Sequence, residues 1–303
     1  MAVYTKINQG DISSLLRQYD IGEIVDFKEV VEGIDNSNFI IRTTAGKFIL
    51  TIFESRIKSQ DLPFFINLKL HLAQKGICCP YPILDRRGSV ITDFKGKKTV
   101  IVTFLNGRPI AQIDRNACFE IGRTLAKLHL AAADFSMSRK NDLGVAGFRD
   151  LLLKFIDLLD SYQIGLRQEI LTNLEFLESA WSHDLPKAAS HLDLFPDNVF
   201  FDDSGKVSGV IDFYFAANEA MILDFAIAAN AWGNVDDLLA GYEDVRKFSS
   251  EEKKFLKIAL AVASMRFLLT RLHDMFFTPK NSLVRIKDPQ EYLLKFRHFR
   301  SQI

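Results

Sequence analysis

Two short segments in the second half of the chain constrain its fold and chemistry more than any other feature. The first follows the pattern His-x-Asp-x-x-x-x-Asn from His191 to Asn198, and the second is Ile-Asp-Phe around Asp212. Residues 198–201 are apolar and aromatic, a turn cluster of sequence Asp-Asp-Ser-Gly follows, and residues 207–211 are apolar again. This pattern predicts a β-hairpin that returns Asp212 to the neighbourhood of Asn198.

The three oxygen-bearing side chains of these segments suit phosphoryl transfer from a metal–nucleotide complex to a hydroxyl group. Asp193 would accept the hydroxyl proton, and Asn198 and Asp212 would hold Mg²⁺ against the nucleotide phosphates. Each residue alone is more often a cap, a turn residue or a hydrogen-bonded loop residue, and only the joint pattern favours catalysis. We expect His191 to be structural, with its imidazole bracing the loop or the backbone near Asp212.

Composition sets broad limits on the class of protein. The chain has 303 residues, enough for two lobes, and its 38 basic side chains balance its 38 acidic ones. This neutral balance argues weakly against a nucleic-acid or membrane partner. Three cysteines without a disulfide or metal spacing indicate reduced thiols in the cytoplasm. We find neither a signal sequence nor a membrane-spanning run of apolar residues.

The first hundred residues alternate as strands do, with one helix among them. A helix is expected over residues 11–19 and another over 61–75, where apolar residues recur at helical spacing before Gly76. The expected strands cover residues 27–31, 38–43, 47–53, 89–93 and 98–104. The sequence therefore predicts a sheet of about five strands with a helix inserted after the third.

Beyond residue 106 the chain is mainly helical. Helices are expected over residues 115–132, 148–162 and 166–182. Ser249 and Glu252 have the spacing of a capping box, which predicts a long apolar helix that continues to about Met275. We expect residues 106–109 to form the boundary and hinge between two lobes. The first, residues 1–105, would bind the nucleotide, and the second, residues 106–303, would carry the catalytic residues.

With this order of elements and motifs, the chain resembles the aminoglycoside phosphotransferase and choline kinase superfamily over nearly its whole length. The resemblance implies an α+β, protein-kinase-like fold of two lobes, with an antiparallel sheet and one helix in the first and a catalytic hairpin among the helices of the second. Likeness to the homoserine kinases of this superfamily is carried by residues 32–39, 48–54, 61–65, 191–201 and 211–216. That branch implies the conversion of L-homoserine and ATP to O-phospho-L-homoserine and ADP in threonine biosynthesis, with Mg²⁺.

The resemblance also assigns roles by position. It matches Asp193 to the base, and Asn198 and Asp212 to the metal ligands. Asp224 matches a recurring aspartate that would hold the catalytic loop, although a helix cap is the more common role for such a residue. The residues implied for nucleotide binding are Gly33, Asn36 and Asn38 in the phosphate loop, Thr51 on the third strand, and Thr103, Phe104 and Leu105 in the linker, whose backbone would bind adenine.

One departure concerns the charge that meets the nucleotide phosphates. Protein kinases carry a Lys on the third strand, and Thr51 stands at the matching position here. Arg42, Lys47 and Arg56 are nearby in sequence, although each is more simply explained as surface charge. Asn36 and Asn38 are equally suited to donate to phosphates or to form Asx turns.

An amino-acid acceptor also requires partners for its carboxylate and its ammonium group. Arginine binds carboxylates best, and the candidates are Arg139, Arg266 and Arg271. The last two lie in an apolar stretch, so one is expected to point into the cleft, unless they extend to solvent or form structural ion pairs. Candidates for the ammonium site are Asp193, Glu219 and Asp224.

Two rival interpretations remain open from sequence. The acceptor could be another small alcohol, such as an aminoglycoside, choline, a methylthioribose or a ketosamine. Alternatively, the chain could be a nucleotide-binding protein without catalytic activity, as the absence of the third-strand Lys would suggest. The oligomeric state cannot be predicted.

Overall fold

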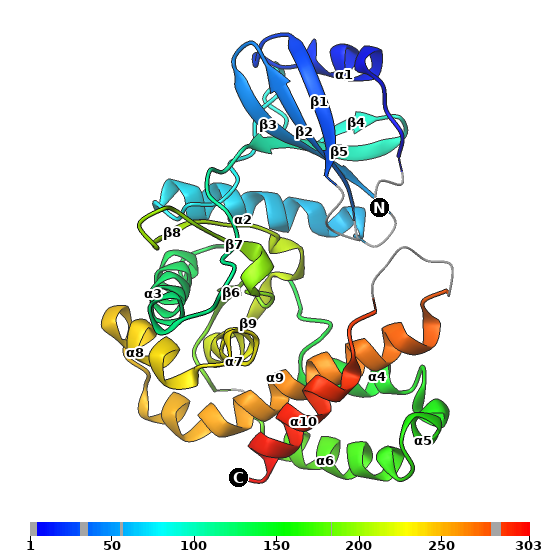
Figure 1. Cartoon of the computed structure of the whole chain (residues 1–303), viewed down its shortest axis with the longest axis vertical. Helices are drawn as coiled ribbons and strands as arrows, with labels where there is room; N and C mark the ends of the chain where they lie inside the picture. The colour runs from blue at the N-terminus through cyan, green and yellow to red at the C-terminus, as the bar shows by residue number, and fades with distance from the viewer. Residues whose placement is uncertain (1–4, 31–35, 55–56, 183, 280–285) are drawn as a thin grey trace.

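The computed structural model of the chain describes residues 5–30, 36–54, 57–182, 184–279 and 286–303. An antiparallel sheet with strand order β1-β2-β3-β5-β4 forms the N-terminal part (Figure 1). Its strands are β1 (Ile24–Val30), β2 (Asn36–Thr43), β3 (Gly46–Phe53), β4 (Thr92–Phe94) and β5 (Lys97–Thr103). The helix α1 (Gln9–Leu16) precedes the sheet, and α2 (Leu62–Gln74) is inserted between β3 and β4. The prediction of five strands with one helix after the third is confirmed.

The two faces of this sheet belong to different apolar clusters. Leu50, Ile52 and Ile101 pack with α1 on one face, whereas Val100 and Val102 pack on the other, against the α2 side. This alternation follows from the two-residue period of a strand. The helix α2 contributes residues both to the second cluster and to the main core, so it joins the sheet to the helices below it in Figure 1.

The remainder of the described chain is mainly helical around two small two-stranded sheets. The helices are α3 (Arg115–Ala132), α4 (Phe148–Leu152), α5 (Leu159–Tyr162), α6 (Leu166–Ala180), α7 (Met221–Trp232), α8 (Val235–Val245), α9 (Ser250–Phe277) and α10 (Pro289–Arg300). The two-stranded pairs are β6 (Lys187–Ser190) with β9 (Ala217–Ala220), and β7 (Val199–Phe201) with β8 (Val207–Val210). The predicted catalytic hairpin and the capping box at the start of α9 are both confirmed.

The expected continuous helix over residues 148–162 is wrong. The chain leaves α4 after Leu152 and resumes a helix at Leu159. Between them the backbone of Phe155 is not helical, with φ −143° and ψ 14°, and its ring is buried against Phe276 on α9, with ring centroids 6.0 Å apart. Leu153 instead projects into solvent with 67% of its surface exposed. Periodicity counts apolar residues, but it cannot show that tertiary packing selects one of them and releases another.

Helices α3 and α8 cross at backbone contact through two glycines. A Cβ atom on Gly122 would lie 2.0 Å from the carbonyl oxygen of Leu238, and one on Gly241 would lie 1.9 Å from the carbonyl oxygen of Phe119. Neither helix can therefore carry a side chain at the crossing. This close approach fixes α3, which contributes His129 to the site described below. No helix among the described residues has the length and apolarity needed to cross a bilayer.

Candidate active site

The catalytic hairpin places Asp212 beside Asn198. Val199 pairs with Val210, and the N–H of Ile211 donates to the carbonyl oxygen of Asn198 at 2.9 Å. Asn198 ends a 3₁₀ turn, η4 (Pro196–Asn198), whose first residue is a proline with its φ fixed in advance. The two expected metal-binding side chains thus come from the two adjacent ends of one hairpin.

Asp193 lies against Asn198 from the preceding loop. The Nδ2 atom of Asn198 donates to the backbone carbonyl of Asp193 at 2.9 Å and to its carboxylate Oδ2 at 3.2 Å. Burial raises the pKa of Asp193 above its ordinary value, although the positive charge of Arg266 opposes the shift. Because the nitrogen of the Asn198 amide is committed to Asp193, its oxygen is the atom available to a metal ion.

The loop before Asp193 is held in a strained conformation. Leu192 has a φ of 62°, a left-handed value that non-glycine residues rarely adopt. The imidazole of His191 accepts a hydrogen bond from the N–H of Asp193 through Nδ1 at 3.2 Å. It donates through Nε2 to the carbonyl oxygen of Ile211 at 2.9 Å. Burial lowers the pKa of His191, which favours the neutral ring that this pair of bonds requires. The ring therefore ties the loop to the strand that carries Asp212.

Asp224 is fully buried in the first turn of α7 and binds this same loop. Its carboxylate accepts from the backbone N–H groups of His191 at 2.8 Å and Leu192 at 2.7 Å, and from Nε2 of His129 on α3 at 3.0 Å. Burial alone would raise its pKa, but these hydrogen bonds and charges lower it. The side chain does not cap α7, whose N-cap is Ala220. The alternative that Asp224 is a helix cap is therefore wrong.

The donor set fits a metal ion that also binds a ligand. Among the described residues, no group of three or more His, Cys, Asp or Glu side chains could hold a metal by itself. Asn198 and Asp212 offer an amide oxygen and a carboxylate at adjacent positions. Mg²⁺ commonly binds through one or two protein oxygens, with the remaining positions filled by phosphate oxygens and water. The residues present are thus suited to Mg²⁺ carried by a nucleotide.

The residues expected to face the phosphates lie mostly within strands. Asn36 and Asn38 are part of β2, and Gly33 falls outside the described residues. The Oδ1 atom of Asn38 accepts from the hydroxyl of Thr51 on β3 at 2.8 Å, and Oδ1 of Asn36 accepts from the N–H of Glu54 at 3.4 Å. Neither asparagine forms an Asx turn. Both join β2 to β3.

The linker leaves the sheet at the end of β5. Thr103 is the last residue of β5 to pair with β3, opposite Phe48, and its hydroxyl accepts from the N–H of Tyr81 at 2.9 Å. Beyond them, Arg108 and Phe201 exchange backbone hydrogen bonds of 2.9 and 3.2 Å. The linker is thereby attached to the catalytic hairpin.

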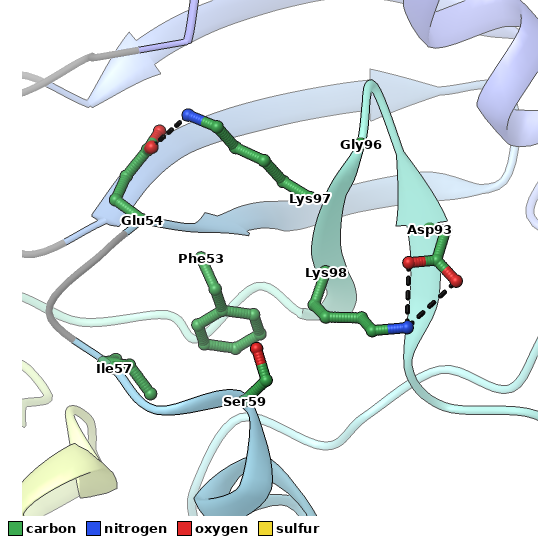
Figure 2. A pocket seen from close by; sticks show the side chains of 8 residues that line it. All are labelled: Phe53, Glu54, Ile57, Ser59, Asp93, Gly96, Lys97 and Lys98. Atoms are coloured by element: carbon green, nitrogen blue, oxygen red, sulfur yellow. Dashed lines mark hydrogen bonds and ion pairs between the residues drawn. The ribbon is translucent and has the colours of Figure 1, made fainter.

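A hollow of about 520 Å³ lies on the N-terminal part, between the end of β3 and the β4–β5 hairpin (Figure 2). Figure 2 shows that its two lysines are already paired, Lys97 with Glu54 and Lys98 with Asp93. The lining contains none of the residues expected to bind nucleotide or metal. With its cations neutralised, this hollow is unsuited to phosphate binding.

The three candidate arginines occupy different surroundings. Arg139 pairs with Asp61 at 2.9 Å and donates to the carbonyl oxygen of Ala216 at 3.2 Å. Arg271 pairs with Glu291 on α10 at 2.7 Å, so it ties α9 to α10.

Arg42, considered above as a phosphate partner, forms an exposed ion pair with Asp26.

Arg266 is the arginine that reaches the catalytic loop. Its side chain is 2% exposed, and Nη1 donates to the carbonyl oxygen of Leu192 at 2.6 Å. The guanidinium lies 4.9 Å from the ring centroid of Phe267, and its Nε is buried without a partner among the described residues. Glu219, an ammonium candidate, accepts from Asn141 Nδ2 at 2.8 Å. The structure thus brings Arg266 to Leu192, the residue before Asp193, but places Arg271 in a helix–helix contact.

Sequence reasoning missed one buried cation beside Asp212. Lys69 on α2 is 4% exposed, and its ammonium lies 5.2 Å from the ring centroid of Tyr214, two residues after Asp212. Burial lowers the pKa of Lys69 to about 8, although Cys79 and Asp212 oppose the shift. Its position on the stripe of Phe65, Leu68 and Leu72 could have revealed it, because a charge there must be buried.

Comparison with known proteins agrees with this geometry. Residues 26–253 match the family described as "Phosphotransferase enzyme family". This match covers well over half of the chain, and the chain belongs to that family. Among curated relatives, the homoserine kinase of Xanthobacter autotrophicus is 45% identical over 98% of this chain and 95% of its own length. That of Sinorhizobium fredii is 40% identical over 100% of this chain and 96% of its own.

Solved structures share the fold at low sequence identity. Amicoumacin kinase hAmiN, in complex with AMP-PNP, Ca²⁺ and Ami, superposes with a TM-score of 0.69 and 15% identity, over 98% of this chain and 93% of its own. Spectinomycin phosphotransferase APH(9)-Ia, in complex with ADP and spectinomycin, gives a TM-score of 0.69 at 13% identity, over 98% and 95%. The α+β, kinase-like fold predicted from the sequence is confirmed.

Proposed function

We propose that this protein is a homoserine kinase, which transfers the γ-phosphoryl group of ATP to the hydroxyl of L-homoserine and yields O-phospho-L-homoserine for threonine synthesis. The observation that carries the proposal is the convergence of Asp193, Asn198 and Asp212 on one hairpin and its preceding loop. Homoserine as acceptor is supported by relatives that are 40–45% identical over 98–100% of the chain. ATP is the co-substrate.

In this proposal each residue of the loop and hairpin has one task. Asp193 orients the acceptor hydroxyl and takes its proton, and its raised pKa brings it closer to neutral pH, where a base works best. Asn198 and Asp212 would hold Mg²⁺, which would supply positive charge beside the transferring phosphoryl group. His191 and Asp224 keep the loop in place, and residues 103–105 bind adenine through their backbone. Residues 1–105 then serve as the nucleotide lobe and residues 106–303 as the catalytic lobe.

The proposal is tested by turnover of the purified protein with Mg·ATP and homoserine. Choline, an aminoglycoside, a methylthioribose and a ketosamine serve as competing acceptors, and the product is identified by mass. We expect O-phosphohomoserine alone, and loss of kcat by about 10²–10⁴-fold in Asp193→Asn. Asp203→Asn, at an exposed position in the turn of the same hairpin, is the matched control and should retain full activity. Phosphorylation of another acceptor in preference to homoserine would refute the assignment.

A protein that only binds nucleotide would give a different result. It would bind ATP without releasing ADP in the presence of any acceptor, and Asp193→Asn would change nothing measurable. The commitment of Asn198 to Asp193 favours catalysis, because binding alone does not require a positioned base. Isothermal titration with ATP beside the turnover assay separates the two outcomes.

A further inference from the structure

The third strand carries no positive charge where kinases use a lysine. Thr51 is buried there and donates its hydroxyl to Asn38 across the sheet at 2.8 Å. A nucleotide triphosphate nonetheless requires positive charge beside the metal ion. Some other cation of this chain must approach the same place, or the metal must act alone.

Lys69 approaches that place from the helix that follows the strand. Its ammonium faces the ring of Tyr214, which packs edge-on against Phe53 at the end of β3 with ring centroids 5.4 Å apart. Asp212 acts electrostatically on both Lys69 and Tyr214, so these groups share one neighbourhood with the metal-binding carboxylate. The side chain thus extends from α2 toward the junction of the sheet and the catalytic hairpin.

The charge of Asp212 and the ring of Tyr214 attract the ammonium, but within the described residues it forms no direct hydrogen bond or ion pair. The nearby thiol of Cys79 is neutral, because burial raises its pKa to about 12. Some buried side-chain nitrogens among the described residues, such as Nε of Arg123 and of Arg266, are sealed from solvent without a hydrogen-bond partner. The Lys69 nitrogen is not one of them. Its nitrogen therefore keeps a small area in contact with solvent.

We propose that Lys69 is the phosphate-binding cation of this enzyme, supplied from α2 in place of the third-strand lysine of other kinases. The assignment rests on the proposed nucleotide-dependent activity but not on which acceptor is used. A buried ammonium is costly unless it is paired, and a phosphate oxygen of the nucleotide supplies the direct hydrogen-bonding partner that no described residue supplies. Tyr214 offers only the weaker attraction of its ring.

The test compares ADP with adenosine as ligands for the full-length protein, by isothermal titration with Mg²⁺ present. Lys69→Met should weaken ADP binding by about 10- to 100-fold, the value of one lost charge-assisted contact, and leave adenosine binding unchanged. Lys69→Arg should retain most of the ADP affinity. Lys75→Met, which removes an exposed lysine paired with Asp134 just after the same helix, should bind ADP as the parent does.

Thermal unfolding without ligand provides a second readout. Replacing an unpaired buried cation with methionine should leave the melting temperature equal to that of the parent or higher. Equal ADP affinity in Lys69→Met and the parent would overturn the proposal, as would a lowered melting temperature together with equal losses of ADP and adenosine binding. Because neither ligand involves the acceptor, a wrong acceptor assignment would leave this test unaffected.

Discussion

Replacing Asp224 with asparagine removes one charge and converts one acceptor oxygen into an NH₂ group without changing the shape of the side chain. In the native protein the two carboxylate oxygens accept three hydrogen bonds of 2.7, 2.8 and 3.0 Å at a site closed to solvent. In either orientation the new NH₂ group faces at least one N–H donor, which is left unpaired. An unsatisfied buried donor costs about 1–3 kcal/mol, and each hydrogen bond to a charged group that is lost costs about 1.5–3 kcal/mol more. We expect the free energy of unfolding to fall by about 3–5 kcal/mol.

The same substitution should impair catalysis beyond its effect on stability. The left-handed backbone of Leu192 costs about 1–3 kcal/mol, and its bond to Asp224 helps to offset that cost. Without this bond the loop relaxes and Asp193 moves from its position beside Asn198. A displacement of about 1 Å at a reacting group lowers turnover by about 100-fold. The KM for ATP should change little, because Asp224 lies behind the loop.

Urea denaturation at pH 7 and steady-state kinetics measure both effects. Asp114→Asn is the matched control, because Asp114 caps α3 by accepting from the N–H of Ala117 at 2.7 Å and asparagine caps equally well. If Asp224→Asn loses no more stability than this control and turns over at the parental rate, Asp224 does not hold the catalytic loop.

The pH dependence of the stability difference between the parent and Asp224→Asn follows from the direction of the pKa shift of Asp224. The pKa of Asp224 is lower in the folded protein than its ordinary value of 3.8. A lowered folded pKa means that the stabilisation is fully present above the unfolded value and is lost as pH falls through the folded one. The gap in stability between the parent and Asp224→Asn should therefore stay constant from pH 7 to about pH 4 and narrow only below that. A gap that narrows between pH 7 and pH 5 would contradict this cause.

Other substitutions separate structural from catalytic roles. Arg271→Met should leave the KM for homoserine within about twofold and cost about 1–2 kcal/mol by urea denaturation, because it breaks the α9–α10 ion pair; a large rise in that KM would place Arg271 in the acceptor site. Arg266→Met should lower kcat by about tenfold or more, because the carbonyl of Leu192 loses its buried partner; parental kcat would show that this bond is dispensable. Gly122→Ala should destabilise the protein by about 1–3 kcal/mol through overpacking, with unchanged KM values in the fraction that remains folded. Stability equal to that of the parent would contradict the close crossing of α3 and α8.

Local patterns were sufficient to predict the elements that carry the chemistry. The strands β2, β3 and β5 are rich in β-branched and aromatic residues, and the turn between β7 and β8 contains residues typical of turns. Both the sheet and the catalytic hairpin therefore follow from short-range rules. The capping box at Ser249 is equally local, because both of its hydrogen bonds lie within three residues. These predictions succeed because nothing distant in sequence decides them.

Contacts between distant residues explain what the sequence could not provide. The carboxylate of Asp224 binds N–H groups more than thirty residues before it, which no local rule distinguishes from a helix cap. Lys69 is buried only because α2 packs between the sheet and the catalytic hairpin. Phe155 leaves the helical pattern to reach α9. In each case the residue type is visible in the sequence, but its partner belongs to a different element.

Backbone strain shows how these distant contacts serve the site. Three non-glycine residues among those described have positive φ values, and one of them, Lys95, stands with Gly96 in the β4–β5 turn, where such values are ordinary. The other two, Leu192 and Asp212, both at 62°, lie immediately before Asp193 and at the proposed metal ligand itself. Strain at both edges of one small site persists only if the surroundings enforce it.

The enforcing contacts come from elements that converge on the loop from outside it. Asp224 on α7 and Arg266 on α9 bind the N–H and the carbonyl of Leu192, and His191 connects the loop to Ile211, the neighbour of Asp212. Each of these side chains is buried, so its bonds are shielded from competition with water. The proposed base and the proposed metal-binding carboxylate are therefore positioned before any substrate arrives. A phosphoryl-transfer site that relies on positioning and electrostatics requires this kind of preorganisation.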